Sequence, residues 1–189
     1  ANMSISSGSG GVIPVATPAA VDIAGNSTAA LTWIYQASGQ GGVILSAVIT
    51  GTDSNTGVTV SDADFTGTIN VQSPAAISSN ISIVPAMNYN GQVFTVSMLV
   101  NNSGEASASS VSITPFVLAE TGASAFMITE PSPLTMTVAG GTSQIFQWTY
   151  SASGDGTITF SAFAMGTDAN TSAVIGSVGT EASVEIRAS

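Results

Sequence analysis

Apolar and polar residues alternate along most of this chain, so that every second side chain is apolar. In the segment Gln92–Val100, Phe94, Val96, Met98 and Val100 share one face, and Phe146, Trp148 and Tyr150 do the same farther along. Alternation with a period of two predicts β-strands that bury one face. The Thr, Val, Ile and aromatic residues in these runs favour such strands. We find no convincing 3.6-residue periodicity of an amphipathic helix, so we expect an all-β protein.

Runs of Gly, Asn and Ser separate the alternating segments. They predict turns, because Gly and Asn tolerate the positive φ of tight hairpins. The turn-like runs are residues 38–42, 101–104, 139–141 and 153–156. In the second half of the chain we expect strands near residues 80–85, 92–101, 108–117, 134–139, 144–151, 156–166 and 180–187. Seven short strands with regular turns are typical of an immunoglobulin-like sandwich of two sheets.

The chain contains an internal repeat in which Trp33 matches Trp148, an offset of 115 residues. The segment Leu31–Gly39 (LTWIYQASG) aligns with Phe146–Gly154 (FQWTYSASG), and the alignment continues without a gap over residues 17–73 and 132–188. Roughly sixteen of about 57 aligned residues are identical, which indicates a repeated folding unit. The offset is too long for a solenoid or propeller repeat and suits a whole sandwich domain of about 100 residues.

The phase of the repeat predicts two domains, residues 1–73 and residues 74–189. The second holds every expected strand of a sandwich. The first lacks counterparts of about residues 74–115, and residues 1–16 are too short to replace three strands. We therefore predict tandem immunoglobulin-like β-sandwich domains, of which the first is incomplete.

An incomplete sandwich leaves apolar side chains in water, because each sheet needs the other to bury its inner face. The side chains that we expect to be exposed in the first domain are Leu31, Trp33, Tyr35, Val43 and Leu45. At about 1.5–3 kcal/mol for each large side chain, the loss is on the order of 10 kcal/mol. That loss is comparable to the whole stability of a domain.

Three explanations for the missing strands are open at this point. The chain is a fragment of a longer repeat protein, or a neighbouring subunit supplies the strands by donor-strand complementation, or the first domain packs its open face against the second. One observation favours assembly: natural sheets protect their edges with charged residues, above all Lys, and this sequence contains no Lys.

Three short motifs stand out in the second domain. They are Gly91–Val96 (GQVFTV), Val100–Ala106 (VNNSGEA), and Ala139–Thr142 (AGGT) shortly before Phe146–Trp148 (FQW). They resemble the immunoglobulin-like repeats of prokaryotic surface proteins, most closely the CARDB-type adhesion domains. The resemblance covers residues 74–189 well and 17–73 in part. It implies an extracellular, modular role and transfers no catalytic residue.

Charge excludes several classes of partner. Only 6% of the residues are charged, the net charge is −10, and Arg187 is the single basic residue. A nucleic-acid-binding protein needs Lys or Arg to neutralise phosphates, and adhesion to an anionic bilayer needs them as well. No run approaches the roughly 20 apolar residues of a membrane-spanning helix. The scarcity of charge and the abundance of Ser and Thr lead us to expect a secreted protein at the cell surface.

The residue types that are absent exclude most catalytic chemistry. Without His, Cys or Lys, the chain cannot form the usual nucleophilic catalytic systems or zinc sites built on His and Cys. A glycosidase needs two carboxylates that flank a cleft, and no pair of acidic residues stands out in that way. We expect no catalytic residue, no organic cofactor and no enzymatic activity.

Calcium is the remaining candidate ligand, because it binds clustered oxygen atoms. The candidate calcium ligands are Asp53, Asn55, Asp168 and Asn170, which occupy matching positions of the repeat, with Asp62 and Asp64 near the first pair. The alternative is that Asp and Asn cap a turn by accepting hydrogen bonds from their own backbone. The repetition favours the alternative, because folding alone would preserve such a turn.

Glycans are a second open class of partner. Asn-X-Ser/Thr triplets begin at Asn2, Asn26, Asn80, Asn101 and Asn170, though several are expected by chance in so Ser/Thr-rich a chain. The pairs Trp33/Trp148 and Tyr35/Tyr150 could form a sugar-binding platform. Their strict alternation within strands predicts core positions instead.

We therefore expect a non-enzymatic structural subunit of an extracellular filament, sheath or surface layer. In this hypothesis the chain forms a homopolymer through its incomplete first domain, by β-strand complementation. The alternative is an adhesin, or a carbohydrate-binding or spacer module, within a larger secreted repeat protein. That alternative predicts exposed aromatic residues on loops, for which the sequence offers only Phe65 and Tyr89.

Overall fold

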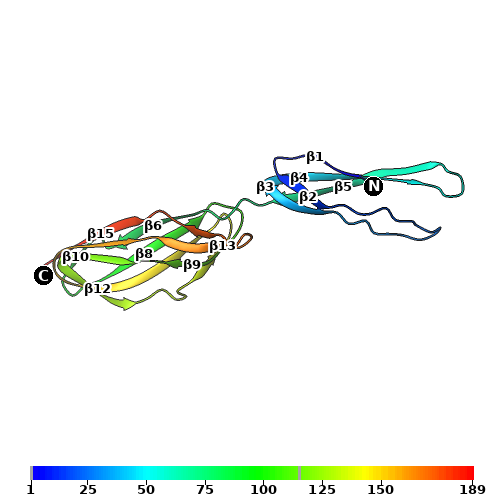
Figure 1. The fold of residues 1–189 in the computed structure, drawn as a ribbon. Helices are drawn as coiled ribbons and strands as arrows, with labels where there is room; N and C mark the ends of the chain where they lie inside the picture. Colours follow the sequence, from blue (N-terminus) through cyan, green and yellow to red (C-terminus); the bar gives the residue numbers. More distant parts are fainter. Residues whose placement is uncertain (1, 115) are drawn as a thin grey trace. The chain divides into compact units, whose positions relative to one another are not determined.

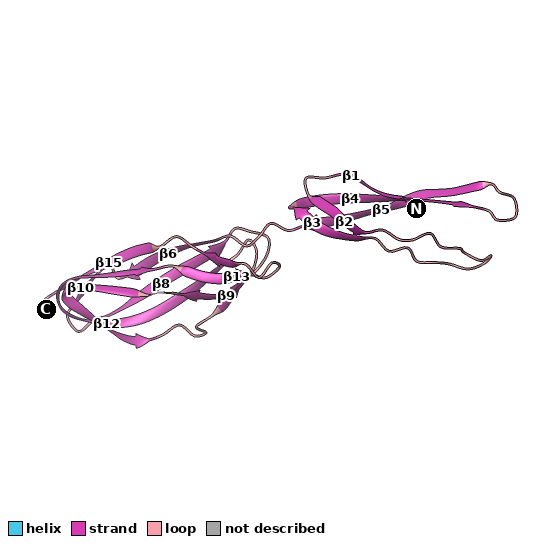
Figure 2. Cartoon of the chain, in the orientation of Figure 1, coloured by secondary structure: helices cyan, strands magenta, loops and turns pink. Residues whose placement is uncertain are grey.

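The computed structural model describes residues 2–114 and 116–189, and these residues form β-strands and loops with no helix (Figures 1 and 2). The side chains of residues 2–7, 63–66 and 117 lie outside this description. The prediction of an all-β protein is confirmed. The chain divides into two compact units, residues 1–73 (unit 1) and residues 74–189 (unit 2). The division falls at the residue where the repeat ends.

Unit 1 contains five strands in two small sheets. They are β1 (Asn2–Ser7), β2 (Gly11–Ala16), β3 (Ile34–Gly39), β4 (Gly41–Thr52) and β5 (Thr59–Val71). One sheet has the order β1-β4-β5, and the other pairs β2 with β3. All these pairs are antiparallel.

Unit 2 contains the other ten strands, arranged as two sheets that enclose one core. They are β6 (Ile77–Val84), β7 (Met87–Tyr89), β8 (Val93–Asn102), β9 (Ala108–Ile113), β10 (Val117–Thr129), β11 (Met136–Val138), β12 (Ser143–Ala162), β13 (Ala164–Asp168), β14 (Val174–Gly176) and β15 (Thr180–Arg187). The larger sheet has the order β6-β8-β12-β15-β7, with β10 also paired to β12. The smaller sheet has the order β11-β9-β13-β14. Unit 2 is therefore a β-sandwich-like fold.

The core of unit 2 follows the alternation in the sequence. In β8 the alternate residues Phe94, Val96, Met98 and Val100 are buried. Phe146, Trp148 and Tyr150 in the first half of β12 are buried too, as are Ile158, Phe160 and Ala162 in its second half. The predicted core faces of these segments are confirmed. The smaller sheet closes the other side of this core with residues such as Val111 and Val138.

The long strand β12 links the predicted strands 144–151 and 156–166 into one element. Its first half pairs with β8 and its second half with β15. The predicted turn at residues 153–156 is wrong, because these residues lie inside β12 and cross close to β10. At the crossing Gly122 has a φ of 75°, and a Cβ atom there would lie 2.5 Å from the carbonyl oxygen of Asp155. Glycine thus lets two paired strands bend together, as strands at sandwich corners do.

At the predicted turn of residues 38–42 the chain bends at Gln40 between β3 and β4, and these two strands pair with other strands and form no hairpin. The turn at residues 139–141 is confirmed by the hydrogen bond from Thr142 N to the carbonyl oxygen of Ala139. Strand β10 was not predicted at all beyond its first residue. It is an edge strand with three consecutive exposed apolar residues, Phe126, Met127 and Ile128, and so lacks simple alternation.

The motif VNNSGEA has a structural role in unit 2. Asn102 is fully buried, and its Oδ1 accepts hydrogen bonds from the backbone N–H groups of Ala76 and Gly104. Its Nδ2 donates to the carbonyl oxygens of Ala106 and Val138. One amide side chain thus joins the start of β6, the end of β8 and the end of β11. Full hydrogen bonding makes a buried polar group tolerable in a core.

The two units share one strand register. In unit 1, β4 pairs with β5 so that Val43 faces Ile69. In unit 2, β12 pairs with β15 so that Ile158 faces Val184, the repeat equivalents of those two residues. The equivalence extends to the hairpin beyond, where Gly51 faces Val60 and Gly166 faces Ile175. Equal register shows that the sequence repeat is a structural repeat.

Strands β1 and β2 take the place in unit 1 that β10 takes in unit 2. Ser4 pairs with Ser46 in β4 as Val117 pairs with Ser161 in β12, and Ile13 pairs with Gln36 as Phe126 pairs with Ser151. Residues 1–16 thus supply the equivalent of β10 only, and they do not replace the three strands of residues 74–115 that unit 1 was expected to lack. No residue is identical between β1–β2 and β10 at this alignment, so the sequence carried no signal for it. Among the described residues of unit 1, β6, β7, β8 and β9 have no equivalent.

Candidate functional site

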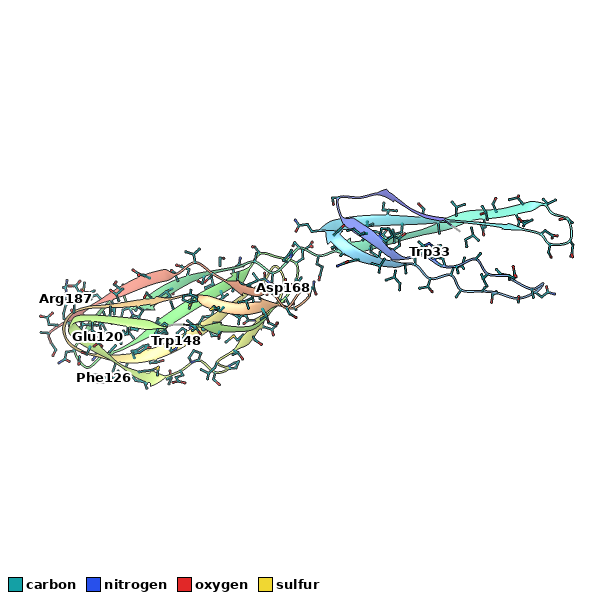
Figure 3. All side chains as sticks on the ribbon, in the orientation of Figure 1. Trp33, Glu120, Phe126, Trp148, Asp168 and Arg187 are labelled. Carbon is teal, nitrogen blue, oxygen red and sulfur yellow. The ribbon has the colours of Figure 1, made fainter. Side chains whose placement is uncertain are left out.

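The candidate site is the surface of unit 1 that corresponds to the covered inner face of unit 2. We define the open face as Leu31, Trp33, Tyr35, Leu45 and Ile69. Their repeat equivalents in unit 2 are Phe146, Trp148, Tyr150, Phe160 and Val184, all of which are buried. The two tryptophans are labelled in Figure 3.

Exposure differs between the two faces although the residue types match. Ile69 is 42% exposed, whereas Val184 is fully buried; Leu31, Trp33, Tyr35 and Leu45 are half-buried. Ile23, beside the open face in sequence, is 54% exposed, and its equivalent Val138 is fully buried. Large apolar side chains at these positions cost free energy while water contacts them. The open face therefore has the composition of a core and the exposure of a surface.

One side chain departs from the expected exposure. Val43 is fully buried, so the prediction that it lies in water is wrong. The reason is the chain between β1 and β2, which passes directly over β4. A Cβ atom on Gly10 would lie 3.0 Å from Cγ2 of Val43. Residues 8–10 thus cover one end of the face, and the remainder stays open.

The open face borders a segment that lacks a strand partner on the side where β8 lies in unit 2. In unit 2, residues 143–151 pair with β8, which places Met98 beside Phe146, Val96 beside Trp148 and Phe94 beside Tyr150. In unit 1 the equivalent residues 28–33 belong to no strand, and β3 begins only at Ile34. The sequence pattern is the same in both units, so the missing partner strand explains the difference. We call residues 28–36 the free edge.

The aromatic side chains of unit 2 show what covers such a face. The rings of Phe94 and Tyr150 stack with their centroids 5.7 Å apart. Phe116 stacks on Trp148 with a centroid distance of 4.5 Å. The face of Trp148 is therefore occupied by a neighbouring ring, and Trp148 is only 7% exposed. The prediction that Trp148 and Tyr150 are core residues is confirmed.

The two Asp–Asn turns of the repeat have the same geometry. Oδ1 of Asp53 accepts hydrogen bonds from the backbone N–H groups of Asn55 and Thr56, at 2.9 and 2.8 Å. Oδ1 of Asp168 accepts from those of Asn170 and Thr171 at the same two distances. These hydrogen bonds lower the pKa of both carboxyl groups. The carboxylates thus cap turns, as the alternative to calcium binding predicted.

The two turns differ in the second carboxylate oxygen. Oδ2 of Asp168 accepts a hydrogen bond of 2.6 Å from the backbone N–H of Ala75, just before β6, and Asp168 is only 1% exposed. This bond is the largest cause of the lowered pKa of Asp168. Asp53 is exposed, and within residues 2–114 and 116–189 no backbone N–H group occupies the corresponding place beside it.

Each unit holds one pair of the candidate calcium ligands. Asp53 and Asn55 lie in unit 1, and Asp168 and Asn170 in unit 2. Among the described residues no three His, Cys, Asp or Glu side chains are grouped so that they could hold a metal ion. Asp62 lies on β5 with an exposed side chain, and the side chain of Asp64 lies outside the described residues.

A groove opens on one side of unit 2, with a volume of about 470 Å³. Its lining includes Phe116, Phe146, Trp148, Leu134, Met127 and the carboxylate of Glu130. Burial and the nearby charge of Glu130 raise the pKa of Tyr150, which also lines the groove, to about 12. The groove is mainly apolar and aromatic, with one acidic side chain at its border.

The remaining polar features are dispersed. In the described part of the chain, the one ion pair joins Arg187 Nε to Glu185 Oε1 at 3.1 Å, and both side chains are half-exposed. Asn26 and Asn80 are exposed, which suits glycosylation, whereas the Asn2 side chain lies outside the description. The aromatic candidates of the adhesin hypothesis are Tyr89, 51% exposed at the end of β7, and Phe65, whose side chain is likewise not described.

The described residues form no helix long and apolar enough to cross a membrane. The sequence matches no known protein family, and no curated protein is similar to it. The resemblance to CARDB-type domains therefore remains a prediction from its motifs.

Proposed function

We propose that this chain is a non-enzymatic structural subunit of an extracellular filament, sheath or surface layer, whose unit 1 is completed by β-strands from a neighbouring subunit. The observation that carries the proposal is the contrast between equivalent faces. Trp148 and its neighbours are buried, with β8 paired beside them and Phe116 stacked on the Trp148 ring, whereas Trp33 and its neighbours are left open at a free edge. An unpaired strand edge beside an apolar face is the arrangement that accepts an added strand.

A second surface of the chain supports assembly. Strand β10 pairs on one side only among the described residues, and Phe126, Met127 and Ile128 on it are each about half exposed or more. Segment 123–129 carries no charged residue, and neither does the free edge. Soluble monomers usually protect such edges with charges or Pro. Two uncharged edges on one chain favour head-to-tail contacts, which generate open filaments.

Composition supports the non-enzymatic and extracellular parts of the proposal. The absence of His, Cys and Lys leaves few catalytic side chains. The neutral, hydroxyl-rich surface and single Arg187 offer little to trypsin-like proteases. The resemblance of the motifs in unit 2 to surface-protein repeats points to the same location.

The test is the assembly state of the purified chain. Multi-angle light scattering and negative-stain electron microscopy would be recorded from about 1 to 100 µM protein. We expect mass to increase with concentration and filaments or layers to appear, because β-strand complementation is a bimolecular association. A compact, well-folded monomer over the whole range would contradict the proposal.

The groove of unit 2 favours one other function, a binding module of a larger secreted protein. Its aromatic lining beside Glu130 is suited to a small, partly apolar ligand. Screening the chain against glycans and small aromatic compounds, with Leu134→Asp as the variant that blocks the groove, would test this function. Saturable binding that Leu134→Asp abolishes would support it.

A further inference from the structure

We propose that unit 1 is an acceptor for one specific kind of segment: an extended, uncharged polypeptide strand supplied from outside residues 1–73, with the pattern of residues 74–102. The inference rests on the proposed function and deepens it, because it names the partner segment, its register and its anchor. The anchor is Asp53, whose Oδ2 would accept a backbone N–H of the incoming segment.

The covered face of unit 2 is the template for the partner. There β8 lies along the first half of β12 and supplies Phe94, Val96 and Met98 to the core. The acceptor residues of unit 1 keep the same spacing, with Tyr35, Trp33 and Leu31 in place of Tyr150, Trp148 and Phe146. Because the register of a strand pair decides which side chains face the core, a β8-like strand fits the free edge in only one phase.

Register equality between the units supports this fit. Strand β4 pairs with β5 as β12 pairs with β15, residue for residue, through seven consecutive pairs from Gly41–Val71 to Ala47–Phe65. The backbone that surrounds the open face is thus arranged as it is around the covered face. A segment that fits one unit has the geometry required by the other.

Charge is compatible with the same partner. The charged side chains of unit 1 are all acidic: Asp22, Asp53, Asp62 and Asp64. Residues 74–102 contain no charged side chain at all. An uncharged segment can approach the acidic unit without repulsion, whereas most other strands of unit 2 carry Glu or Asp.

Asp53 is the position that fixes the start of the incoming segment. In unit 2 the Asp168 carboxylate uses Oδ1 for its turn and Oδ2 for the N–H of Ala75, 2.6 Å away. In unit 1 the turn is complete, and no backbone donor of a described residue lies at the second position. A hydrogen bond to a charged acceptor is stronger than one between neutral groups. Asp53 would therefore act as a positioning residue that sets the register of the added strand.

The experiment uses the full chain and an acetylated peptide of sequence Pro74–Asn102 as the probe. The Trp148→Phe variant leaves Trp33 as the single tryptophan, so that its fluorescence reports on the open face. We expect saturable binding with a blue shift of the Trp33 emission, because the peptide excludes water from the ring. A control peptide with Ser in place of Phe94, Val96 and Met98 should give no shift.

The anchor is tested by Asp53→Asn, which keeps Oδ1 for the turn but replaces the second oxygen with an N–H donor. We expect about a tenfold loss of peptide affinity, the size of one hydrogen bond to a charged group. The matched control is Asp62→Asn, which removes the same charge from an exposed position on β5 and should leave affinity unchanged. Equal affinities for both variants would overturn the role of Asp53.

Assembly measured on the same samples separates this inference from the proposed function. If the chain assembles but the peptide neither binds nor inhibits assembly, the acceptor inference is wrong and the structural function stands. If the peptide binds and the chain stays monomeric, the acceptor site stands and self-assembly is wrong. Inhibition of assembly by the peptide, and not by its Ser control, would support both.

Discussion

The carboxylate of Asp168 accepts a hydrogen bond from the backbone N–H of Ala75, 93 residues earlier in the chain, at 2.6 Å. This contact joins the turn after β13 to the start of β6, at the end of unit 2 where Asp168 is labelled in Figure 3. Asp53, its equivalent by sequence and by turn geometry, has no such partner among the residues that the structure describes. The two units therefore differ at one carboxylate oxygen: Oδ2 of Asp168 accepts a backbone hydrogen bond, and Oδ2 of Asp53 accepts none from a described backbone N–H group.

Asp168→Asn should lower the thermal midpoint of unit 2 by several degrees. Asn keeps an oxygen for the turn, but its amide cannot accept from Ala75, and a buried N–H without a partner is destabilising. Differential scanning calorimetry would measure the change. Asp53→Asn is the matched control and should leave the midpoint of the isolated chain nearly unchanged, because no second donor is lost.

The same contact makes the stability of unit 2 sensitive to acid. Hydrogen bonds from Ala75 first, and then from Thr171, lower the pKa of Asp168 below its ordinary value of 3.8. A lowered pKa in the folded state contributes stability that is present above the unfolded value and is lost as the pH falls through the folded value. Denaturation curves below pH 4 should show this loss. Asp168→Asn should reduce the slope, and an identical slope would contradict the assignment.

Amide hydrogen exchange should distinguish the two copies of one sequence motif. Residues 28–33 belong to no strand, whereas their equivalents 143–148 pair with β8. Unpaired amides in an open segment exchange fast, and amides in a core strand are protected. Mass spectrometry of exchanged peptides should show fast exchange in 28–33 and strong protection in 143–148. Comparable protection in the two segments under dilute conditions would show that the free edge is already covered.

Tyr150 should ionise late and destabilise unit 2 when it does. Burial, followed by the charge of Glu130, raises its pKa to about 12. Because the folded value is higher than the unfolded value near 10, the stabilising contribution is complete below pH 10 and is lost as the pH rises toward 12. The difference between ultraviolet titrations of the native chain and Tyr150→Phe would give the value. Glu130→Gln should shift that transition to lower pH.

Gly122→Ala should destabilise unit 2 by more than Gly91→Ala. Both glycines have positive φ, 75° and 81°, so both substitutions strain the backbone by about 1–2 kcal/mol. The added Cβ at residue 122 also meets the carbonyl oxygen of Asp155, whereas nothing lies within 4 Å at residue 91. Urea denaturation of the two variants would isolate this clash. Equal losses would show that β10 and β12 can separate at their crossing without cost.

Much of unit 2 could be predicted from alternation alone. The buried faces of β8 and β12 follow the apolar positions, since a half-buried strand requires a period of two. Glycine-rich segments were less informative. Residues 153–156 read as a turn, yet they continue β12, because glycine permits a close strand crossing as readily as a turn. Strand β10 was missed for a different reason. Its three consecutive exposed apolar residues break the alternation that marks the two faces of a strand.

By itself, the sequence determined that this protein is built of β-strands, that it repeats with an offset of 115 residues, and that it lacks His, Cys and Lys. Side-chain alternation and residue type are local properties, so they can be read without coordinates. The tertiary structure alone decided which of the two repeated segments, residues 28–33 or residues 143–148, forms a strand. Residues 143–148 pair with β8 and are extended, and residues 28–33 have the same pattern but no partner. A strand is stabilised by hydrogen bonds to its neighbour, and that neighbour lies far away in sequence or in another molecule.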